Sequence, residues 1–463
     1  MPSYNVLIVG AGVAGPALAY ALATKTYEKR DVPLRIALLE RSLSKPDRII
    51  AEFLQPGGVT ALKKLGLESC LGELGSISLS GYHVLRGGQS ICSSFPEGHV
   101  AETFDHGAFI MALRDRARRA PNIDVIETTV TSLIENKDTH RVIGVLASKA
   151  GGQPQSYFAD LVVLADGSSS KFRTAVLGNM PYEPLQGGYF AGLIVKDLKL
   201  LMPEYATMAV LKGAGPVIIF ELPDNTHRVL IELKRPPPDI KEHIIHDIIP
   251  QLPSSARAPI LNALETSRVR RVPHYYLPPT KQGGSSKAGA FLLGDSLNVR
   301  HPLTAGGMTV ALNDVVIISD LLAHIENFGN WDEISAVLRK WHHMRKSLAH
   351  IINVMSMGWA GIFAAEGEAF DIMQEGAFKY FGKGAEYADE PMSLAAGITH
   401  SPLLLARNSL AIVIYSIWVL FTHPRPGNKS APQFYEYPLL FIKALNVIWT
   451  IGMVMGPVMW AEM

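Results

Sequence analysis

The sequence predicts an α/β fold with three parts: a parallel-sheet domain, an inserted domain with a mixed β-sheet, and a C-terminal helical region. Short apolar runs at residues 4–9, 158–165 and 289–293 are followed by glycine or Asp-Gly, which is typical of buried parallel strands. Residues 34–39 form another such run, and from about residue 310 the pattern is helical. These observations indicate a parallel sheet assembled from distant segments and followed by helices.

Composition narrows the class of protein. The 463 residues suit two or three lobes, and a mean hydropathy of +0.16 with only 18% charged residues is apolar for a soluble enzyme. A formal net charge of +1 argues against a nucleic-acid partner. The two cysteines, Cys70 and Cys92, support neither a disulfide framework nor a metal or redox motif. The cysteine content therefore predicts no metal site and a reduced cytosolic environment. A strand-like run begins already at Tyr4, so we also expect no signal peptide.

A glycine motif follows the first strand. Gly10-Ala11-Gly12-Val13-Ala14-Gly15 lies between this strand and a helix expected over residues 13–23. Here Gly10 permits a tight turn, Gly12 lets the backbone approach a pyrophosphate, and Gly15 allows close helix–strand packing. The free N–H groups of the helix then bind the phosphates, and Glu40, after the second strand, can accept hydrogen bonds from a ribose. This unit fits FAD and NAD equally; the alternative is a glycine turn beside an incidental surface glutamate.

A second anchor favours FAD. Asp295 follows the strand at 289–293, where its carboxylate can hold a ribityl chain, and Arg300-His301-Pro302-Leu303-Thr304-Ala305-Gly306-Gly307-Met308 comes next. Gly306 and Gly307 would let the backbone approach a flat ring, and the helix they open would direct its positive end at a reduced flavin. The sequence therefore predicts a Rossmann-type FAD-binding domain. We interpret His301, beside a proline, as structural and not as a general base.

The inserted domain is predicted from a hairpin. Residues 216–222 and 227–233 flank the turn sequence Pro223-Asp224-Asn225-Thr226. Their period-2 alternation predicts a sheet with one solvent-exposed face, and hence a separate lobe.

The C-terminal tail has an unusual composition. Residues 408–421 and 444–460 are almost uncharged, although neither run reaches the ~20 residues of a spanning helix. Arg407 and Lys443 stand at their leading edges, where long side chains can reach lipid headgroups, and tryptophans suit an interfacial depth. We expect two helices that dip into one leaflet of a membrane. The alternative is a pair of ordinary core helices.

Several motifs resemble a known family. The Gly10–Gly15 motif, Asp166-Gly167 and Gly294-Asp295 together resemble group A flavoprotein monooxygenases. Asp47-Arg48-Ile49, the segment Glu52-Phe53-Leu54-Gln55-Pro56-Gly57-Gly58 and the block from Arg300 to Leu312 resemble squalene epoxidase more specifically. The likeness extends from about residue 4 to the C-terminus. Ala305 departs from it, because the family has a triple glycine here.

The resemblance implies a set of site residues. The positions expected to bind FAD are Gly10, Gly12, Val13, Ala14, Gly15, Glu40, Arg41, Arg48, Arg114, Val130, Asp166, Asp295, Pro302, Gly306, Gly307 and Met308. Arg48 and Arg114 could pair with phosphates, the alternative being surface ion pairs. Gln55 and Tyr82 match the family's polar pair beside flavin and substrate, and we assign them the catalytic role. The substrate pocket would contain Phe53, Gln55, Tyr82, Phe363, Phe378 and Phe381; without the resemblance these aromatic residues would be assigned to the core.

The resemblance also implies a domain division. The FAD-binding domain would comprise residues 1–75, 105–175 and 275–350, the substrate-binding domain 76–104 and 176–274, and the C-terminal helical region 351–463.

The implied activity is epoxidation of a long isoprenoid alkene, squalene to 2,3-oxidosqualene, through a flavin hydroperoxide. Electrons would come from NADPH through a microsomal cytochrome reductase, at the cytosolic face of the endoplasmic reticulum membrane. Two alternatives stay open: oxygenation of another terpenoid or meroterpenoid, and a flavoprotein that does not oxygenate.

Overall fold

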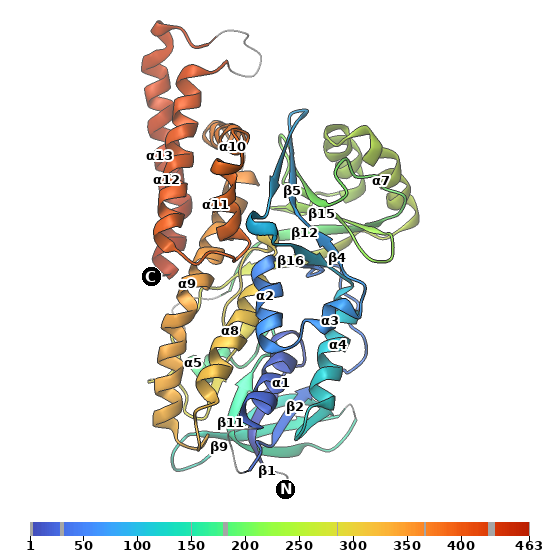
Figure 1. The fold of residues 1–463 in the computed structure, drawn as a ribbon, viewed down its shortest axis with the longest axis vertical. Coiled ribbons are helices and arrows are strands. Elements are labelled where there is room, and N and C mark those ends of the chain that lie inside the picture. Colours follow the sequence, from blue (N-terminus) through green and yellow to red (C-terminus); the bar gives the residue numbers. More distant parts are fainter. Residues whose placement is uncertain are drawn as a thin grey trace.

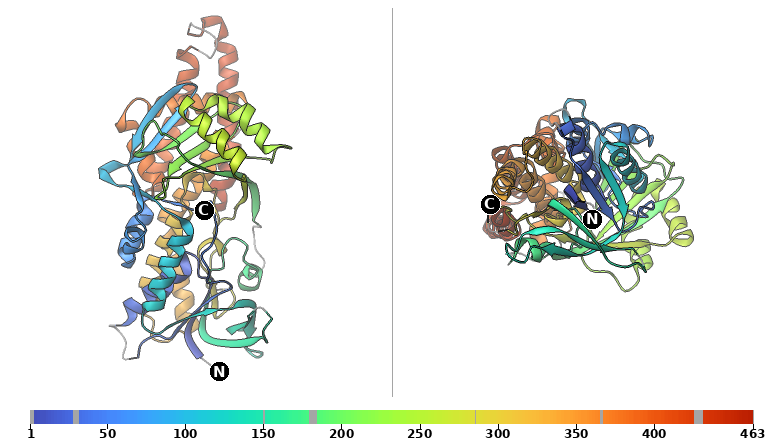
Figure 2. Two further views of the ribbon diagram at one scale, coloured as in Figure 1. Left: turned by 90° about the vertical axis from the view of Figure 1, so that its right-hand side faces the viewer. Right: turned by 90° about the horizontal axis from the view of Figure 1, so that it is seen from below.

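The computed structural model describes residues 3–27, 32–149, 151–178, 184–284, 286–364, 367–424 and 431–462. Two large sheets follow one another along the molecule, and the C-terminal helices run beside them (Figure 1). The N-terminus lies at the end formed by the first sheet, and the last two helices extend past the second sheet (Figure 2). This mixed α/β arrangement confirms the predicted fold class.

The first sheet has the predicted parallel centre. Its seven strands are β8 (Ile123–Glu127), β2 (Ile36–Glu40), β1 (Ser3–Val9), β11 (Gln155–Leu164), β10 (Val142–Ser148), β9 (Thr129–Glu135) and β17 (Ala290–Leu292), which pairs with β11. β1 pairs in parallel with β2 and β11, and β9 and β10 add an antiparallel edge. The second half of β1, Val6–Val9, is apolar and buried, as expected at the centre of a parallel sheet. The covering helices are α1 (Ala14–Tyr27), α4 (His106–Arg119) and α8 (Gly307–Leu322).

The second sheet contains the predicted hairpin. Its strand order is β16 (Arg270–Tyr276), β12 (Leu185–Val195), β15 (His227–Leu233), β14 (Val217–Glu221), β13 (Tyr205–Val210), β5 (Gly81–Arg86) and β6 (Gln89–Ser94). β14 and β15 pair antiparallel, as expected.

The prediction that this sheet has one solvent-exposed face was wrong. Val229 and Ile231 of β15 pack in one core cluster with α7 (Ser254–Thr266), whereas Leu230 packs in another cluster with Phe53. Both faces are buried because helices cover one side and the FAD-binding half covers the other. The alternation in the sequence therefore separates two cores and does not separate core from solvent.

Smaller elements connect these layers. β3 (Phe53–Leu54), β7 (Ala101–Thr103) and β4 (Ile77–Leu79) form a three-stranded sheet beside α2 (Pro56–Leu65). The other short helices are α3 (Ser69–Gly72), α5 (Arg173–Leu177) and α6 (Ile240–His243). This sheet places Phe53 and Gln55 between the two large sheets.

The C-terminal region is helical, as predicted. It comprises α9 (Trp331–Phe363), α10 (Glu368–Phe381), α11 (Ala385–Ala395), α12 (Pro402–Thr422) and α13 (Tyr437–Glu462). α9 is one continuous helix of 33 residues that packs against both α8 and α13. The domain boundary expected at residue 350 therefore falls inside a helix that links the FAD-binding half to the tail.

The tail helices are longer than their uncharged runs indicated. α12 begins at Pro402, where the Ser401 hydroxyl accepts a hydrogen bond from the Leu404 N–H, and so starts before the uncharged run. Both α12 and the segment from Phe434 to Glu462 are long and apolar enough to cross a membrane, judged by length and composition. The expectation that neither reaches spanning length was therefore wrong.

The alternative of core helices is also wrong, because the tail exposes large apolar side chains. Phe441 is 61% exposed and Trp449 is 70% exposed. The two cations expected to reach headgroups form ion pairs instead: Arg407 with Glu390 and Lys443 with Glu368. These pairs attach α12 and α13 to the neighbouring helices α11 and α10.

Candidate functional site

Two adjoining cavities lie between the sheets and the C-terminal helices. The first is lined by residues from both glycine turns and from the second sheet, including Gly12, Asp295 and Gly307. The second lies between the second sheet and helices α9, α10 and α11. Tyr82 and Leu303 line both cavities, so they mark the junction.

The first glycine turn lies between β1 and α1. Gly10 has a φ of +102°, and a Cβ on it would lie 2.4 Å from the Ala165 carbonyl oxygen. A Cβ on Gly15 would lie 1.9 Å from the Gly10 oxygen, so close helix–strand packing requires this glycine. A Cβ on Gly12 would meet nothing within 4 Å, and Gly12 lines the first cavity. The three glycines thus have the three separate structural roles that the motif predicts.

Glu40 and Arg114 hold this turn from both sides of Ala11. The Ala11 N–H donates to Glu40 Oε2 at 2.7 Å, and Arg114 Nε donates to the Ala11 carbonyl at 2.8 Å. Arg114 Nη2 lies 3.7 Å from Glu40 Oε2, and burial lowers the pKa of this guanidinium. Both side chains therefore shape the turn, and their direct contact with FAD stays a prediction.

The second turn joins β17 to α8. Asp295, Pro302, Gly307 and Met308 all line the first cavity, and a Cβ on Gly307 would meet nothing within 4 Å. Gly306 differs, because a Cβ there would lie 2.3 Å from Ile352 Cγ2 in α9. Gly306 therefore allows close packing against α9, and the approach of its backbone to a flat ring stays a prediction.

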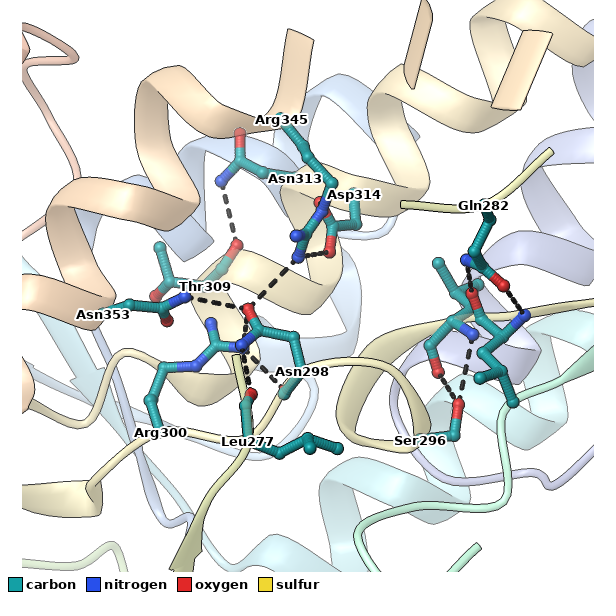
Figure 3. A network of polar contacts seen from close by, with 12 residues as sticks. Leu277, Gln282, Ser296, Asn298, Arg300, Thr309, Asn313, Asp314, Arg345 and Asn353 are labelled. Atoms are coloured by element: carbon teal, nitrogen blue, oxygen red, sulfur yellow. Dashed lines mark hydrogen bonds and ion pairs between the residues drawn. The ribbon is translucent and has the colours of Figure 1, made fainter. Parts of the chain in front are cut away.

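A buried polar network fastens this turn to the helices behind it (Figure 3). Asn298 Oδ1 accepts from Arg300 Nη2 at 2.9 Å, from Asn353 Nδ2 at 3.1 Å and from Arg345 Nη2 at 3.3 Å. Arg345 also forms a bidentate ion pair with Asp314 of α8, at 2.8 and 2.7 Å. A buried, charge-assisted network of this kind fixes the position of the turn.

Gln55 and Tyr82 form the expected polar pair. Gln55 Nε2 donates to the Tyr82 hydroxyl and to the Thr304 carbonyl, both at 2.7 Å. Burial raises the pKa of the Tyr82 phenol, although the hydrogen bond from Gln55 opposes this shift, so Tyr82 is a neutral phenol. The Tyr82 ring stacks on Phe53 with centroids 5.9 Å apart. The pair therefore places polar groups at the junction of the cavities.

The second cavity is aromatic. Phe363, Phe378 and Phe381 line it, as expected, together with Trp359 and Met392, which the sequence reasoning missed. An apolar enclosure of this kind accommodates a hydrocarbon chain and keeps water from the junction.

The predicted residues fall into three groups. Those lining the first cavity are Gly12, Val13, Ala14, Arg48, Phe53, Tyr82, Asp295, Pro302, Gly307 and Met308. Those lining the second are Gln55, Tyr82, Phe363, Phe378 and Phe381. Within the described part of the chain, the others are not among the lining residues of either cavity: Gly10, Gly15, Glu40, Arg41, Arg114, Val130, Asp166 and Gly306.

Two of the outlying residues differ in setting. Arg41 is exposed after β2. Asp166 is half-buried where β11 ends, and burial raises the pKa of its carboxyl. Direct contact of either residue with a cofactor stays a prediction.

Sequence reasoning missed other lining residues. Glu52 and Arg300 line the first cavity and lie in the quoted motifs, but they were not assigned to the site; His106, Phe190 and Leu230 line it and lie in none of those motifs. One signal was present: the run HRVLIEL in β15 places charges on what should be an apolar core strand. Buried charges are rare unless they are paired, so such residues deserve inspection as candidate site residues.

The cavity fits a dinucleotide with a flat ring. Gly12 and Gly307 leave open space where side chains would otherwise stand. Gly12 comes just before α1 and Gly307 begins α8, and the free N–H groups at a helix start can bind an anion. Asp295 lines the same cavity and offers a carboxylate for hydroxyl groups. Both ends of FAD would thus find backbone surfaces without side chains.

Comparisons with known proteins agree with this geometry. A family model described as squalene epoxidase matches residues 158–431. The squalene epoxidase of Aspergillus fumigatus is 35% identical over 476 residues, covering 99% of this chain and 93% of the relative. The squalene monooxygenase of Rattus norvegicus is 33% identical, covering 96% of this chain and 77% of the relative.

Solved structures share the fold. PqsL of Pseudomonas aeruginosa, a probable FAD-dependent monooxygenase, has a TM-score of 0.64 at 17% identity, covering 78% of this chain and 97% of that protein. The p-nitrophenol 4-monooxygenase PnpA of Pseudomonas putida has a TM-score of 0.68 at 14% identity, covering 87% and 100%. The sequence relatives, the matched family and the two joined cavities lead to one conclusion: this chain belongs to the squalene epoxidase family.

Proposed function

We propose that this chain is an FAD-dependent monooxygenase that converts squalene to 2,3-oxidosqualene, with electrons delivered from NADPH by a separate membrane-bound reductase. The observation that carries the proposal is the junction at Tyr82, where a cavity lined by both glycine turns meets an aromatic cavity. Overall, the alkene, O₂, two electrons and two protons give an epoxide and water. FAD, when bound and reduced, supplies the electrons and activates the oxygen.

The residues of the chain contribute binding, orientation and exclusion of water. Phe363, Phe378 and Phe381 enclose the hydrocarbon, and Phe53 with Tyr82 forms the wall where the reacting double bond would lie. Tyr82, a neutral phenol bonded to Gln55, offers a fixed polar edge and no charge. Holding the alkene in one orientation is worth about 7–11 kcal/mol of the barrier in favourable cases.

Attachment to a membrane is the second part of the proposal. The exposed apolar residues of α12 and α13, such as Phe441 and Trp449, support attachment to the endoplasmic reticulum membrane, from which squalene would enter. Replacing both residues by lysine should reduce flotation of the protein with phospholipid vesicles, whereas the same change at exposed Val32 should leave flotation unchanged. Equal flotation of both variants would contradict the attachment.

Isotope labelling tests the activity. Purified protein with FAD, squalene, NADPH, an NADPH-dependent microsomal reductase and ¹⁸O₂ should give singly labelled 2,3-oxidosqualene by mass spectrometry. A labelled product from a prenylated quinol, but not from squalene, would replace squalene as the substrate. Consumption of NADPH with no labelled product from either compound would overturn the oxygenase assignment.

A further inference from the structure

One face of β15 carries two buried charges that are opposite in sign. Arg228, Leu230 and Glu232 alternate along the strand and therefore point to the same side, and Leu230 lines the first cavity. Arg228 and Glu232 are only 6% and 2% exposed. Burying charges beside an apolar cavity is costly unless each has a specific partner.

Arg228 holds the segment that carries the polar pair. Its Nε and Nη2 donate to Glu52 Oε2 and Oε1 at 2.5 and 2.8 Å, a bidentate ion pair. Burial raises the pKa of the Glu52 carboxyl, and the bonds from Arg228 oppose that shift. Glu52 lies three residues before Gln55, so the ion pair ties this segment to the second sheet.

Glu232 holds the second turn. Its Oε1 lies 3.2 Å from His301 Nε2 and 2.9 Å from His274 Nε2. His301 Nδ1 accepts a hydrogen bond from the Leu303 N–H, so the proton of the neutral ring is on Nε2 and points at Glu232.

This arrangement also decides between a hydrogen-bond cluster and a metal site. Glu232, His274 and His301 lie close enough together to hold a metal ion. A metal on His301 Nε2 would require a proton on Nδ1, where the Leu303 N–H already donates. The contacts therefore favour a hydrogen-bond cluster.

The two attachments close a ring. Gln55 Nε2 donates to the Thr304 carbonyl at 2.7 Å, which joins the segment held by Arg228 to the turn held by Glu232. We propose that this ring, defined as Arg228–Glu52, Gln55–Thr304 and His301–Glu232, sets the distance between the flavin-side turn and the Gln55–Tyr82 pair. Arg228 and Glu232 are thus positioning residues for the oxygen transfer. This inference rests on the proposed function.

Paired apolar substitution tests the ring without leaving an unpaired charge. Arg228→Met alone strands the Glu52 carboxylate and is expected to fold poorly, whereas Arg228→Met with Glu52→Leu removes both charges. We expect the double variant to fold and bind FAD. Epoxide formed per NADPH oxidised should fall by about tenfold to 100-fold, with the missing oxygen recovered as H₂O₂ and KM for squalene little changed.

The Lys287–Glu135 pair supplies the control. It is an ion pair of 2.6 Å at the end of β9, and neither residue lines a cavity, belongs to the ring or holds a glycine turn. Lys287→Met with Glu135→Leu should leave epoxide yield per NADPH unchanged. Glu232→Gln keeps one acceptor oxygen for His301 and should retain coupling, whereas Glu232→Leu should lose it.

Two measurements separate this inference from the proposed function. Wild-type protein that makes no epoxide from squalene would overturn the function, but the ring would still be tested by the visible circular dichroism of bound FAD. That spectrum should change in Arg228→Met/Glu52→Leu and in Glu232→Leu, and not in the control pair. A folded, FAD-bound Arg228→Met/Glu52→Leu variant with wild-type coupling or a wild-type spectrum would overturn the ring.

Discussion

The two glycine turns flanking the first cavity differ in what surrounds them. At the first turn, a Cβ on Gly10 would meet the backbone of Ala165, and one on Gly15 would meet the Gly10 oxygen, whereas one on Gly12 would meet nothing within 4 Å. At the second turn, a Cβ on Gly306 would meet the Ile352 side chain of α9. Ala305 there has a φ of +50°, a left-handed conformation unusual for a residue with a Cβ.

This difference shows that glycine serves two purposes in these turns: it leaves space for a ligand at one position and allows close packing at another. The crowded glycines of the first turn meet backbone atoms at the strand ends, whereas Gly306 of the second meets a side chain of a distant helix. Substitution of Gly12 should therefore affect binding, and substitution of Gly306 should affect packing.

Gly12→Val should produce the largest effect. The added side chain meets no protein atom within 4 Å, so the fold should persist while the pyrophosphate loses its place. We expect FAD binding to weaken by at least about 100-fold, or about 2.8 kcal/mol, in a fluorescence titration. Gly307→Val, with equally open space, should weaken binding less because the second turn is expected to face the flavin ring and not the pyrophosphate. A yellow Gly12→Val preparation with normal affinity would contradict the assignment of the first turn.

Gly306→Ala should act on stability. The new methyl would stand 2.3 Å from buried Ile352 Cγ2, and overpacking of this kind costs about 1–3 kcal/mol. Thermal unfolding followed by circular dichroism measures the loss. In a double variant with Ile352→Ala the two effects should be less than additive, because the truncation makes room for the methyl. Strict additivity would show that Gly306 has another role.

Acidification should loosen the second turn before the first. Burial lowers the pKa of His301. Burial alone would raise the pKa of Glu232, but hydrogen bonds from His274 and His301 lower it overall. Both groups therefore contribute stability to the fold when the pH is above their ordinary pKa values. That stability is lost as the pH falls below 6.5 for His301 and below 4.5 for Glu232. Asp166 beside the first turn has a raised pKa, and its contribution changes in the opposite direction.

Hydrogen exchange can resolve this contrast. Between pH 7.5 and 5.5, after correction for intrinsic rates, peptides covering residues 301–308 should lose protection and those covering 10–15 should not. His301→Gln should remove most of this pH dependence. An equal loss of protection at both turns would mean that protonation of His301 does not act specifically on the second turn.

Ala305→Gly should give the smallest effect, and a favourable one. Glycine adopts φ = +50° without the cost of about 1 kcal/mol that a Cβ imposes there. The melting temperature should rise slightly, and FAD affinity should stay within a few-fold of wild type. A fall in melting temperature would show that the Ala305 methyl, which lines the cavity, contributes packing.

The sequence by itself determined the elements whose signals are local. The first turn, the parallel strands and the β14–β15 hairpin could be predicted because each depends on neighbouring residues, through apolar periodicity, glycine spacing and turn chemistry. The resemblance to squalene epoxidase added Gln55 and Tyr82, whose contact the structure shows directly.

Only the tertiary structure decided how distant segments meet. Gln55 and Thr304 are 249 positions apart, and Glu52 and Arg228 are 176 apart, so no local pattern could pair them. The same holds for Gly306, whose neighbour lies in α9, and for the buried second face of the inserted sheet. Periodicity reports which side of a strand is apolar, but what covers that side depends on the chain's path through space.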